Sequence, residues 1–449
     1  MGKRERSAKL ISVMVSATLA TGMVPAAAFA QSAPASLDQG VGSASPAATE
    51  IAQASETEAQ QQAEVPEAGV QPLEAEAPAG QAMSGQCGAT ETDDVAWALV
   101  QNNADDKNPT YTLSFTGKGA MENWLEHRAS GNNSCGTDSS ISPTECDNPR
   151  CALNRPWAAY LDNITKVTIS EGITRLGSES LLGIENVDSI ELPESLEYIG
   201  FGSMAQMTSL SSITIPDATK AIETSAFYGD NSLAAIGFSD AGNLEAIGDY
   251  AFSGAAFSGE LSLPEGLERI GIAPFESCQG VKELVIPSTV QSYGVSAGEW
   301  NSLFNGATSS LKKVTIKSSA DLPRDMFREQ KALESVEIVG GVESIGASAF
   351  WKCTKLSLVS GTGSVKTFGE QAFRDDSELR EIDLSGAESI EDWCFSGSAL
   401  VNAAVPNAQN IGSCAFDKCG NLSSLTLGGG LRRFRTASFQ VTTDFRRLT

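Results

Sequence analysis

The stretch Leu333-Glu-Ser-Val-Glu-Ile338, followed by Ile345-Gly-Ala-Ser-Ala-Phe350, contains the two patterns that decide the fold. The first pattern places apolar residues where one face of a β-strand would bury them. The second has a glycine where the chain turns and a Cβ would clash, and a phenylalanine that we expect to point inward on the return path. Copies of both patterns recur from Ile164 onward.

The strand pattern recurs with a nearly constant period. Its last apolar residue lies at positions 169, 192, 215 and 238, each 23 residues apart, and later copies end at 263, 286, 316, 338, 384, 405 and 427. One unit buries about six apolar side chains at about 1.5–3 kcal/mol each, against an ordering cost of about 1–2 kcal/mol per residue. Because a lone unit would be unstable, the sequence predicts stacked coils that share one long parallel β-sheet.

The repeated unit resembles the BspA-like leucine-rich repeats of bacterial surface proteins, which read roughly I-G-x-x-A-F-x-x-C-x-x-L-x-x-I-x-I-P. Cys278, Cys353 and Cys419 fall on the cysteine of that pattern, and the resemblance covers about residues 164–439. It implies a leucine-rich-repeat solenoid in which these cysteines pack in the core and are not nucleophiles. It also implies a secreted or cell-surface protein engaged in adhesion or protein binding.

Composition divides the rest of the chain. Residues 1–30 have a basic head, an apolar stretch and an Ala-Phe-Ala ending, which predict a secretory signal peptide; an uncleaved membrane anchor is the alternative. Residues 31–85, rich in Ala, Glu, Gln and Pro, predict a disordered spacer. Short alternating runs in residues 86–160 predict a small β-rich N-terminal module, which resembles the β-module that often precedes such repeats. The solenoid is expected over 161–440 and a tail over 441–449.

Aromatic residues of the module have two interpretations. Trp97, Trp124 and Trp157 are expected to form its core, and stacking against sugars is the alternative.

Cysteines of the exported chain also have two interpretations. Cys135, Cys146 and Cys151 lie in a polar loop where a disulfide is expected, with Cys87 as a candidate partner. A zinc site is the alternative, although the spacings match no paired C-x-x-C pattern.

Charge and residue types argue against several function classes. A net charge of −25 argues against DNA, RNA or anionic membranes as partners, because these need basic patches. No segment after the signal peptide is apolar for the roughly 20 residues that a membrane span needs. His127 is the only histidine, so we expect no enzyme activity and assign no catalytic, cofactor or metal residues.

The outward positions of the repeat strands form the predicted ligand face, because side chains alternate along a strand. Small hydroxyls and carboxylates dominate there, and a soluble face without a ligand is the alternative. Trp300 lies in a seven-residue insertion between positions 286 and 316, where it would anchor a partner or fold back onto its own repeat. The candidate ligand residues are Lys166, Thr168, Glu191, Thr214, Glu283, Lys313, Thr315, Glu337, Asp383 and Trp300.

These observations predict an exported protein that mediates adhesion or protein binding through its repeat surface. The expected partner is an extracellular or surface protein, in some cases host-derived, and no cofactor is expected. Two alternatives remain open: a repeat scaffold that carries a wall-active or carbohydrate-binding N-terminal module, and a passive surface-coat component.

Overall fold

The computed structural model describes residues 83–103, 107–124, 155–238, 242–295, 302–304, 310–434 and 447–448. All of them belong to one compact unit, Gly69–Thr449. The predicted signal peptide and most of the predicted spacer lie outside the described residues. The same is true of Trp300 and of Cys135, Cys146 and Cys151.

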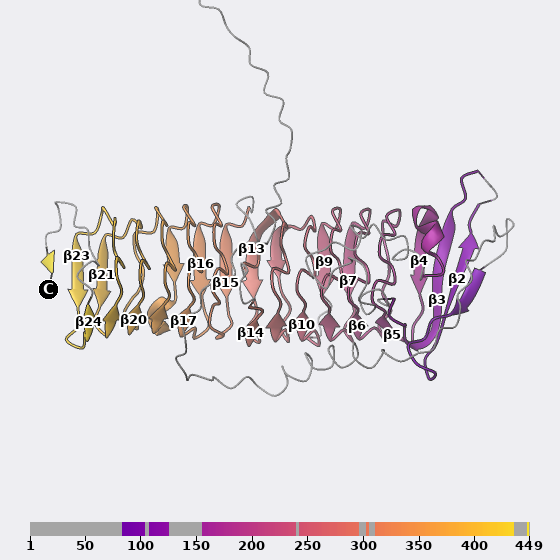
Figure 1. The fold of residues 1–449 in the computed structure, drawn as a ribbon, viewed down its shortest axis with the longest axis horizontal. Coiled ribbons are helices and arrows are strands. Elements are labelled where there is room, and N and C mark those ends of the chain that lie inside the picture. The colour runs from indigo at the N-terminus through magenta and orange to yellow at the C-terminus, as the bar shows by residue number, and fades with distance from the viewer. Residues whose placement is uncertain are drawn as a thin grey trace, which may run out of the picture. The chain divides into compact units, whose positions relative to one another are not determined.

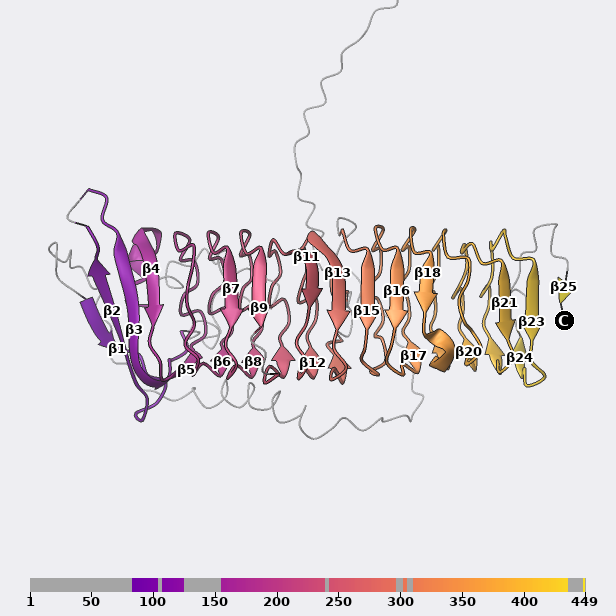
Figure 2. The same ribbon diagram turned by 180° about the vertical axis from the view of Figure 1, so that it is seen from behind.

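The repeats form a parallel β-solenoid, which confirms the predicted leucine-rich-repeat architecture (Figures 1 and 2). A first row of strands runs side by side along the stack, and neighbours pair in parallel within the groups β7-β9, β11-β13-β15-β16-β18 and β21-β23-β25. The strands of this row are β4 (Ile164–Ile169), β7 (Ser212–Ile215), β9 (Ala235–Phe238), β11 (Ser258–Ser262), β13 (Gly280–Ile286), β15 (Lys313–Ile316), β16 (Ser335–Ile338), β18 (Leu358–Ser360), β21 (Asn402–Val405), β23 (Ser424–Leu427) and β25 (Arg447–Leu448).

A second row of short strands lies where each coil turns back, so the solenoid contains two parallel rows where the sequence predicted one long sheet. Each strand of this row is only two residues long, except β5 with four. The strands of this row are β5 (Ile173–Leu176), β6 (Tyr198–Ile199), β8 (Ala221–Ile222), β10 (Ala246–Ile247), β12 (Arg269–Ile270), β14 (Ser292–Tyr293), β17 (Ser344–Ile345), β19 (Thr367–Phe368), β20 (Ser389–Ile390), β22 (Asn410–Ile411) and β24 (Arg433–Phe434).

The register of the first row follows the period read from the sequence. Ile215 lies opposite Phe238, and Ile286, Ile316 and Ile338 are aligned across three strands. The longer interval between positions 286 and 316 therefore leaves the pairing intact. Residues 187–192 and 379–384 match the strand pattern but form no strand, although Ile190 and Leu384 are buried there.

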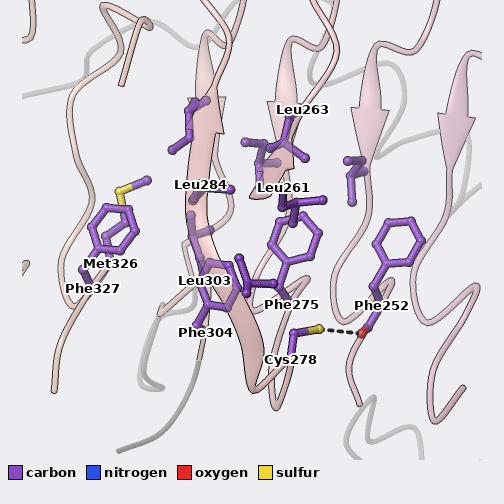
Figure 3. Close-up of a cluster of buried hydrophobic side chains, with 14 of the residues drawn as sticks. Phe252, Leu261, Leu263, Phe275, Cys278, Leu284, Leu303, Phe304, Met326 and Phe327 are labelled. Carbon is purple, nitrogen blue, oxygen red and sulfur yellow. Dashed lines mark hydrogen bonds between the residues drawn. The ribbon is translucent and has the colours of Figure 1, made fainter. Parts of the chain in front are cut away.

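The return segment of each coil stacks through backbone hydrogen bonds and phenylalanine rings. The Phe327 N–H donates to the Ala349 carbonyl at 2.7 Å, and the Phe350 N–H donates to the Ala372 carbonyl at 2.8 Å. The ring centroids of Phe327 and Phe350 are 5.5 Å apart and nearly parallel. Figure 3 shows Phe252, Phe275, Phe304 and Phe327 following one another through the core. The inward orientation predicted for these phenylalanines is confirmed, because they are almost fully buried.

Residues before the repeats form an antiparallel sheet that continues into the solenoid. It consists of β1 (Met83–Gln86), β2 (Asp94–Gln101) and β3 (Tyr111–Ala120), and β3 also pairs in parallel with β4 and β5. Two 3-10 helices, η2 (Ala158–Asn163) and η3 (Thr362–Ser364), complete the described elements. The β-rich segment therefore covers the first coil as a cap.

Side chains near η2 fix this cap to the first coil. The Arg155 guanidinium is buried and donates to the Leu182 carbonyl at 2.7 Å, and the Trp157 indole donates to the Ser180 carbonyl at 3.1 Å. Trp157 is fully buried, and its ring lies 5.5 Å from that of Trp97 and 5.3 Å from that of Trp124. The three tryptophans thus belong to the packed interior or its margin, as expected, which argues against sugar stacking.

Candidate functional site

Four of the predicted ligand residues lie together on one sheet of the first row. Glu283 on β13 is the register partner of Lys313 on β15, and Thr315 on β15 is the partner of Glu337 on β16. Glu283, Lys313 and Glu337 are exposed. The structure therefore brings these side chains to one outward surface with both signs of charge.

The other predicted residues are separated from this group. Lys166 and Thr168 lie on β4 and Thr214 on β7, whereas Glu191 and Asp383 lie on exposed segments without a strand. The Thr168 hydroxyl donates to the Ser114 hydroxyl at 2.9 Å and so fills a local role.

Asp383 is also engaged locally. Its carboxylate accepts a hydrogen bond from the Ser385 N–H at 2.9 Å, and bonds from Ser385 lower the pKa of the carboxyl. The described first-row strands from β4 to β23 contain no tryptophan, tyrosine or arginine.

The return segments carry the larger side chains that the first row lacks. Arg328, Trp351 and Arg374 directly follow the stacked phenylalanines of three successive coils, so they are spaced by 23 residues. The Arg328 guanidinium lies 4.0 Å from the centre of the Trp351 ring, the Lys352 ammonium 4.5 Å and the Arg374 guanidinium 5.9 Å. Arg374 also lies 5.2 Å from the Trp393 ring. We call Arg328, Trp351, Lys352, Arg374 and Trp393 the cation–aromatic column.

Carboxylates hold parts of this column in place. Asp325 is 3% exposed and pairs with Arg324 and Arg328 at 3.3 Å each. The Trp351 indole N–H donates to Asp375 at 3.3 Å. The column was not predicted from the sequence because these residues differ from one copy of the repeat to the next, yet the 23-residue spacing of Arg328, Trp351 and Arg374 was a signal that could have revealed part of it.

Three cysteines of the repeat, Cys278, Cys353 and Cys419, are buried, and each thiol donates a hydrogen bond. The Cys353 Sγ lies 3.1 Å from the Phe327 carbonyl oxygen in the preceding coil, and Cys278 and Cys419 make the equivalent contact. Burial raises the pKa of the Cys278 thiol to about 12 and that of Cys419 to about 11. Because a nucleophilic cysteine needs a thiolate, these residues act in packing, as the resemblance implied.

Cys87, the candidate disulfide partner, is a free thiol in the structure. It is buried, and burial raises its pKa to about 12. The described residues contain no group of three or more histidine, cysteine, aspartate or glutamate side chains that could hold a metal ion. None of the described helices is long and apolar enough to cross a membrane.

In the coil that follows Cys353, the residue at the cysteine position is Asp376, 23 residues later, so a carboxyl group replaces the thiol there. One of its oxygens accepts a hydrogen bond from the Cys353 N–H at 2.8 Å, while the second oxygen is buried without a partner among the described residues. Burial raises the pKa of Asp376 well above its ordinary value of 3.8. The folded chain therefore holds this proton at pH values where an unfolded chain releases it.

Asp376→Asn is expected to raise the free energy of unfolding at pH 7 by about 1–3 kcal/mol. The asparagine amide oxygen keeps the hydrogen bond from the Cys353 N–H. We expect the amide nitrogen to donate to the Phe350 carbonyl, in the way that the Gln330 amide nitrogen donates to the Phe304 carbonyl at 2.6 Å. The native carboxyl weakens the fold as pH rises above 3.8, because only the unfolded chain then loses its proton.

The gain from Asp376→Asn should therefore disappear below pH 3.8, where both states are protonated. Urea unfolding of both proteins at pH 7 and pH 3 measures this difference. A gain of equal size at both pH values would contradict the buried-carboxyl explanation.

The repeats match a known family. Residues 158–258, 203–327, 245–380 and 320–446 match the model described as BspA type Leucine rich repeat region, with 6 copies. Together the matched segments cover more than half of the chain. No curated protein matches the chain.

Several solved structures are similar to this chain at low identity. A leucine-rich repeat protein from Bacteroides ovatus is 22% identical, with a TM-score of 0.38, over 60% of this chain and 56% of its own. A leucine rich cell surface protein from Faecalibacterium prausnitzii is 19% identical, with a TM-score of 0.34, over 77% and 95%. The pneumococcal vaccine antigen PcpA is 18% identical, with a TM-score of 0.28, over 83% and 92%. The chain thus spans little more than half the length of the Bacteroides ovatus protein.

Proposed function

Since the chain belongs to the BspA-type leucine-rich repeat family, we propose that it is an exported, secreted or cell-surface protein that binds another protein through its repeat surface. The observation that carries the proposal is the stacking itself. Each coil buries its apolar residues and presents its variable residues in rows on the outside, so neighbouring coils build one continuous surface. The basic head, apolar stretch and Ala-Phe-Ala ending of residues 1–30 support export.

The proposal assigns no catalytic role to the chain. The buried cysteines are held as thiols, and the cations of the cation–aromatic column, Arg328, Lys352 and Arg374, are paired with Asp325, Glu329 and Asp375. A carbohydrate-binding N-terminal module is disfavoured because Trp157 and Trp97 are buried and their rings are covered. The partner is proposed to be an extracellular or surface protein.

Binding to a panel of purified extracellular and cell-surface proteins tests this function. The chain from residue 31 onward is immobilised, and biolayer interferometry records saturable binding, while antibody labelling of intact cells tests exposure at the surface. We expect labelled cells and at least one saturable partner. Labelled cells with no partner across the panel would contradict the binding function, and ordered self-association in light scattering would favour a coat component.

A further inference from the structure

The first row of strands is interrupted between β9 and β11, although both strands are formed. Wherever two other successive coils of the described chain carry first-row strands, these strands pair, as β7 does with β9 and β11 with β13. No pairing joins β9 to β11, and Figure 2 shows them further apart than β7 and β9. The second row is continuous at this point, because β10 pairs with both β8 and β12. The interruption is therefore confined to the first row.

Backbone groups of first-row strands alternate in direction. The N–H of an inward residue donates to the following coil, as that of Leu263 does to the Val285 carbonyl at 3.1 Å. The N–H at an outward position donates to the preceding coil, as that of Val339 does to the Ile316 carbonyl at 2.7 Å. In a parallel pair the N–H and C=O of one residue point to the same side, so the carbonyls alternate in the same way.

This alternation aims two backbone edges into the interruption. Ile236 and Phe238 are the inward residues of β9, and Glu260 and Ser262 occupy outward positions of β11. The backbone N–H and C=O groups of these four residues have no hydrogen-bond partner among the described residues. Unpaired strand edges are templates for pairing with another chain.

Apolar side chains at the interruption are incompletely covered. Ile236 and Phe238 are partly exposed. The residues at the same two places of the flanking strands are buried, namely Ile213 and Ile215 on β7 and Leu261 and Leu263 on β11. The outward residues of β9 are Ala235 and Gly237, which are too small to obstruct an approaching chain. An extended backbone supplies donors and acceptors to both edges and directs every second side chain inward.

We propose that an extended segment of a partner protein docks between β9 and β11 as an added strand. This inference rests on the proposed protein-binding function and assigns it to one place in the first row. Main-chain hydrogen bonds hold the segment, and apolar side chains at alternate positions cover Ile236 and Phe238. Glu260 is exposed and is in no ion pair with a described cation, so a basic residue on the outward side of the segment fits beside it.

The spacer of this chain does not supply such a segment. Residues 31–82 contain no two large apolar residues at alternate positions, and prolines interrupt them repeatedly. Proline cannot donate to a strand ladder. The first-row strands of a second copy are held within their own coils, so a free extended segment of another protein is the better occupant.

Fluorescence anisotropy with the chain from residue 31 onward tests the assignment. The probe is a fluorescein-labelled peptide that alternates Val with Lys or Thr, and its control has the same side chains on an N-methylated backbone. The test variant is Ser262→Pro, which removes an N–H that β13 does not use and puts a ring in the path of the added strand. Proline is tolerated at an unpaired strand edge. The matched variant Ser262→Ala keeps the N–H.

We expect the probe to bind the unaltered chain and the N-methylated control to bind weakly. Ser262→Pro should lose about tenfold or more in affinity, whereas Ser262→Ala should lose about twofold or less. The probe should also slow hydrogen exchange of the backbone amides of Ile236, Phe238, Glu260 and Ser262 and leave those of β15 and β16 unchanged. Circular dichroism verifies folding, and the exchange measurement on the unaltered chain decides the matter if the proline variant does not fold.

Several outcomes would overturn the inference. These are equal binding of the N-methylated control, equal losses in the two Ser262 variants, no binding of the probe, and protection of the same amides by self-association without it. A panel partner that binds Ser262→Pro as well as the unaltered chain would also refute this place while leaving the proposed function intact. The absence of any panel partner for the unaltered chain would instead refute the proposed function.

Discussion

Phe350→Ala is expected to lower the free energy of unfolding by about 3–5 kcal/mol. Phe350 is fully buried, with its ring 5.5 Å from that of Phe327 and 5.1 Å from that of Phe373. Removing the ring opens a cavity that three successive coils border. The backbone bonds on both sides of the coil hold the walls apart, so the cavity cannot close easily.

Urea unfolding measures the loss, and Phe350→Leu is the matched control. Leucine keeps most of the buried volume, so we expect that variant to lose about 1 kcal/mol. Because each coil contacts only its neighbours, hydrogen exchange in the alanine variant should rise first in the coils around Phe327 and Phe373. A loss below about 1 kcal/mol for alanine would contradict a shared interior at this position.

Gly361→Ala is expected to destabilise the chain by about 3 kcal/mol, because two costs act together. Gly361 has a φ of 79° and a ψ of 14°, a left-handed conformation that a Cβ disfavours. A Cβ at this position would also overlap the Ile338 carbonyl oxygen in the preceding coil. That oxygen is backbone, so the clash is relieved only by shifting one coil relative to the next.

Gly341→Ala is the control for this substitution. A Cβ at Gly341 meets no atom within 4 Å, and its φ is not in the left-handed region. Thermal unfolding of both variants should therefore show a large loss for Gly361→Ala and a small change for Gly341→Ala. Similar losses of stability in the two variants would show that the flexibility of the glycine backbone, and not the close approach of neighbouring coils, determines the effect of both substitutions.

The architecture was predictable because it depends on residues that repeat. A period of about 23 residues places Ile316 beside Ile338, which follows it by 22 positions, and burial requires an apolar residue at this place in each turn. The second row of strands was not predicted, because two residues such as Ser344 and Ile345 are too few to show alternation. Its strands depend on pairing with neighbouring coils, which one coil's sequence does not display.

The sequence also did not predict that residues other than glycine adopt the left-handed backbone conformation. Ser348 and Lys352 have φ values of 56° and 62° at the two bends of the return segment, as do residues at the same places in other coils. Hydrogen bonds to adjacent coils hold these bends, for example from the Ser348 N–H to the Glu370 carbonyl at 2.8 Å. Tertiary contacts thus override the local preference of the residue.

The candidate site was predicted only in part. The first-row residues Glu283, Lys313, Thr315 and Glu337 were expected on one face, and strand alternation places them there. The cation–aromatic column depends on side chains that no repeat pattern fixes, so only the register of three coils brings Arg328 next to Trp351.

Cross-linking of register partners tests the stacking of coils most directly. Lys313 and Ser335 are partners on β15 and β16, and adjacent strands lie about 4.8 Å apart, within the roughly 4.4–6.8 Å that a disulfide needs between Cα atoms. Lys313→Cys with Ser335→Cys should therefore form a disulfide on mild oxidation, identified by peptide mass spectrometry. Lys313→Cys with Glu337→Cys, two residues out of register, should not. Efficient cross-linking of the second pair without the first would contradict the account.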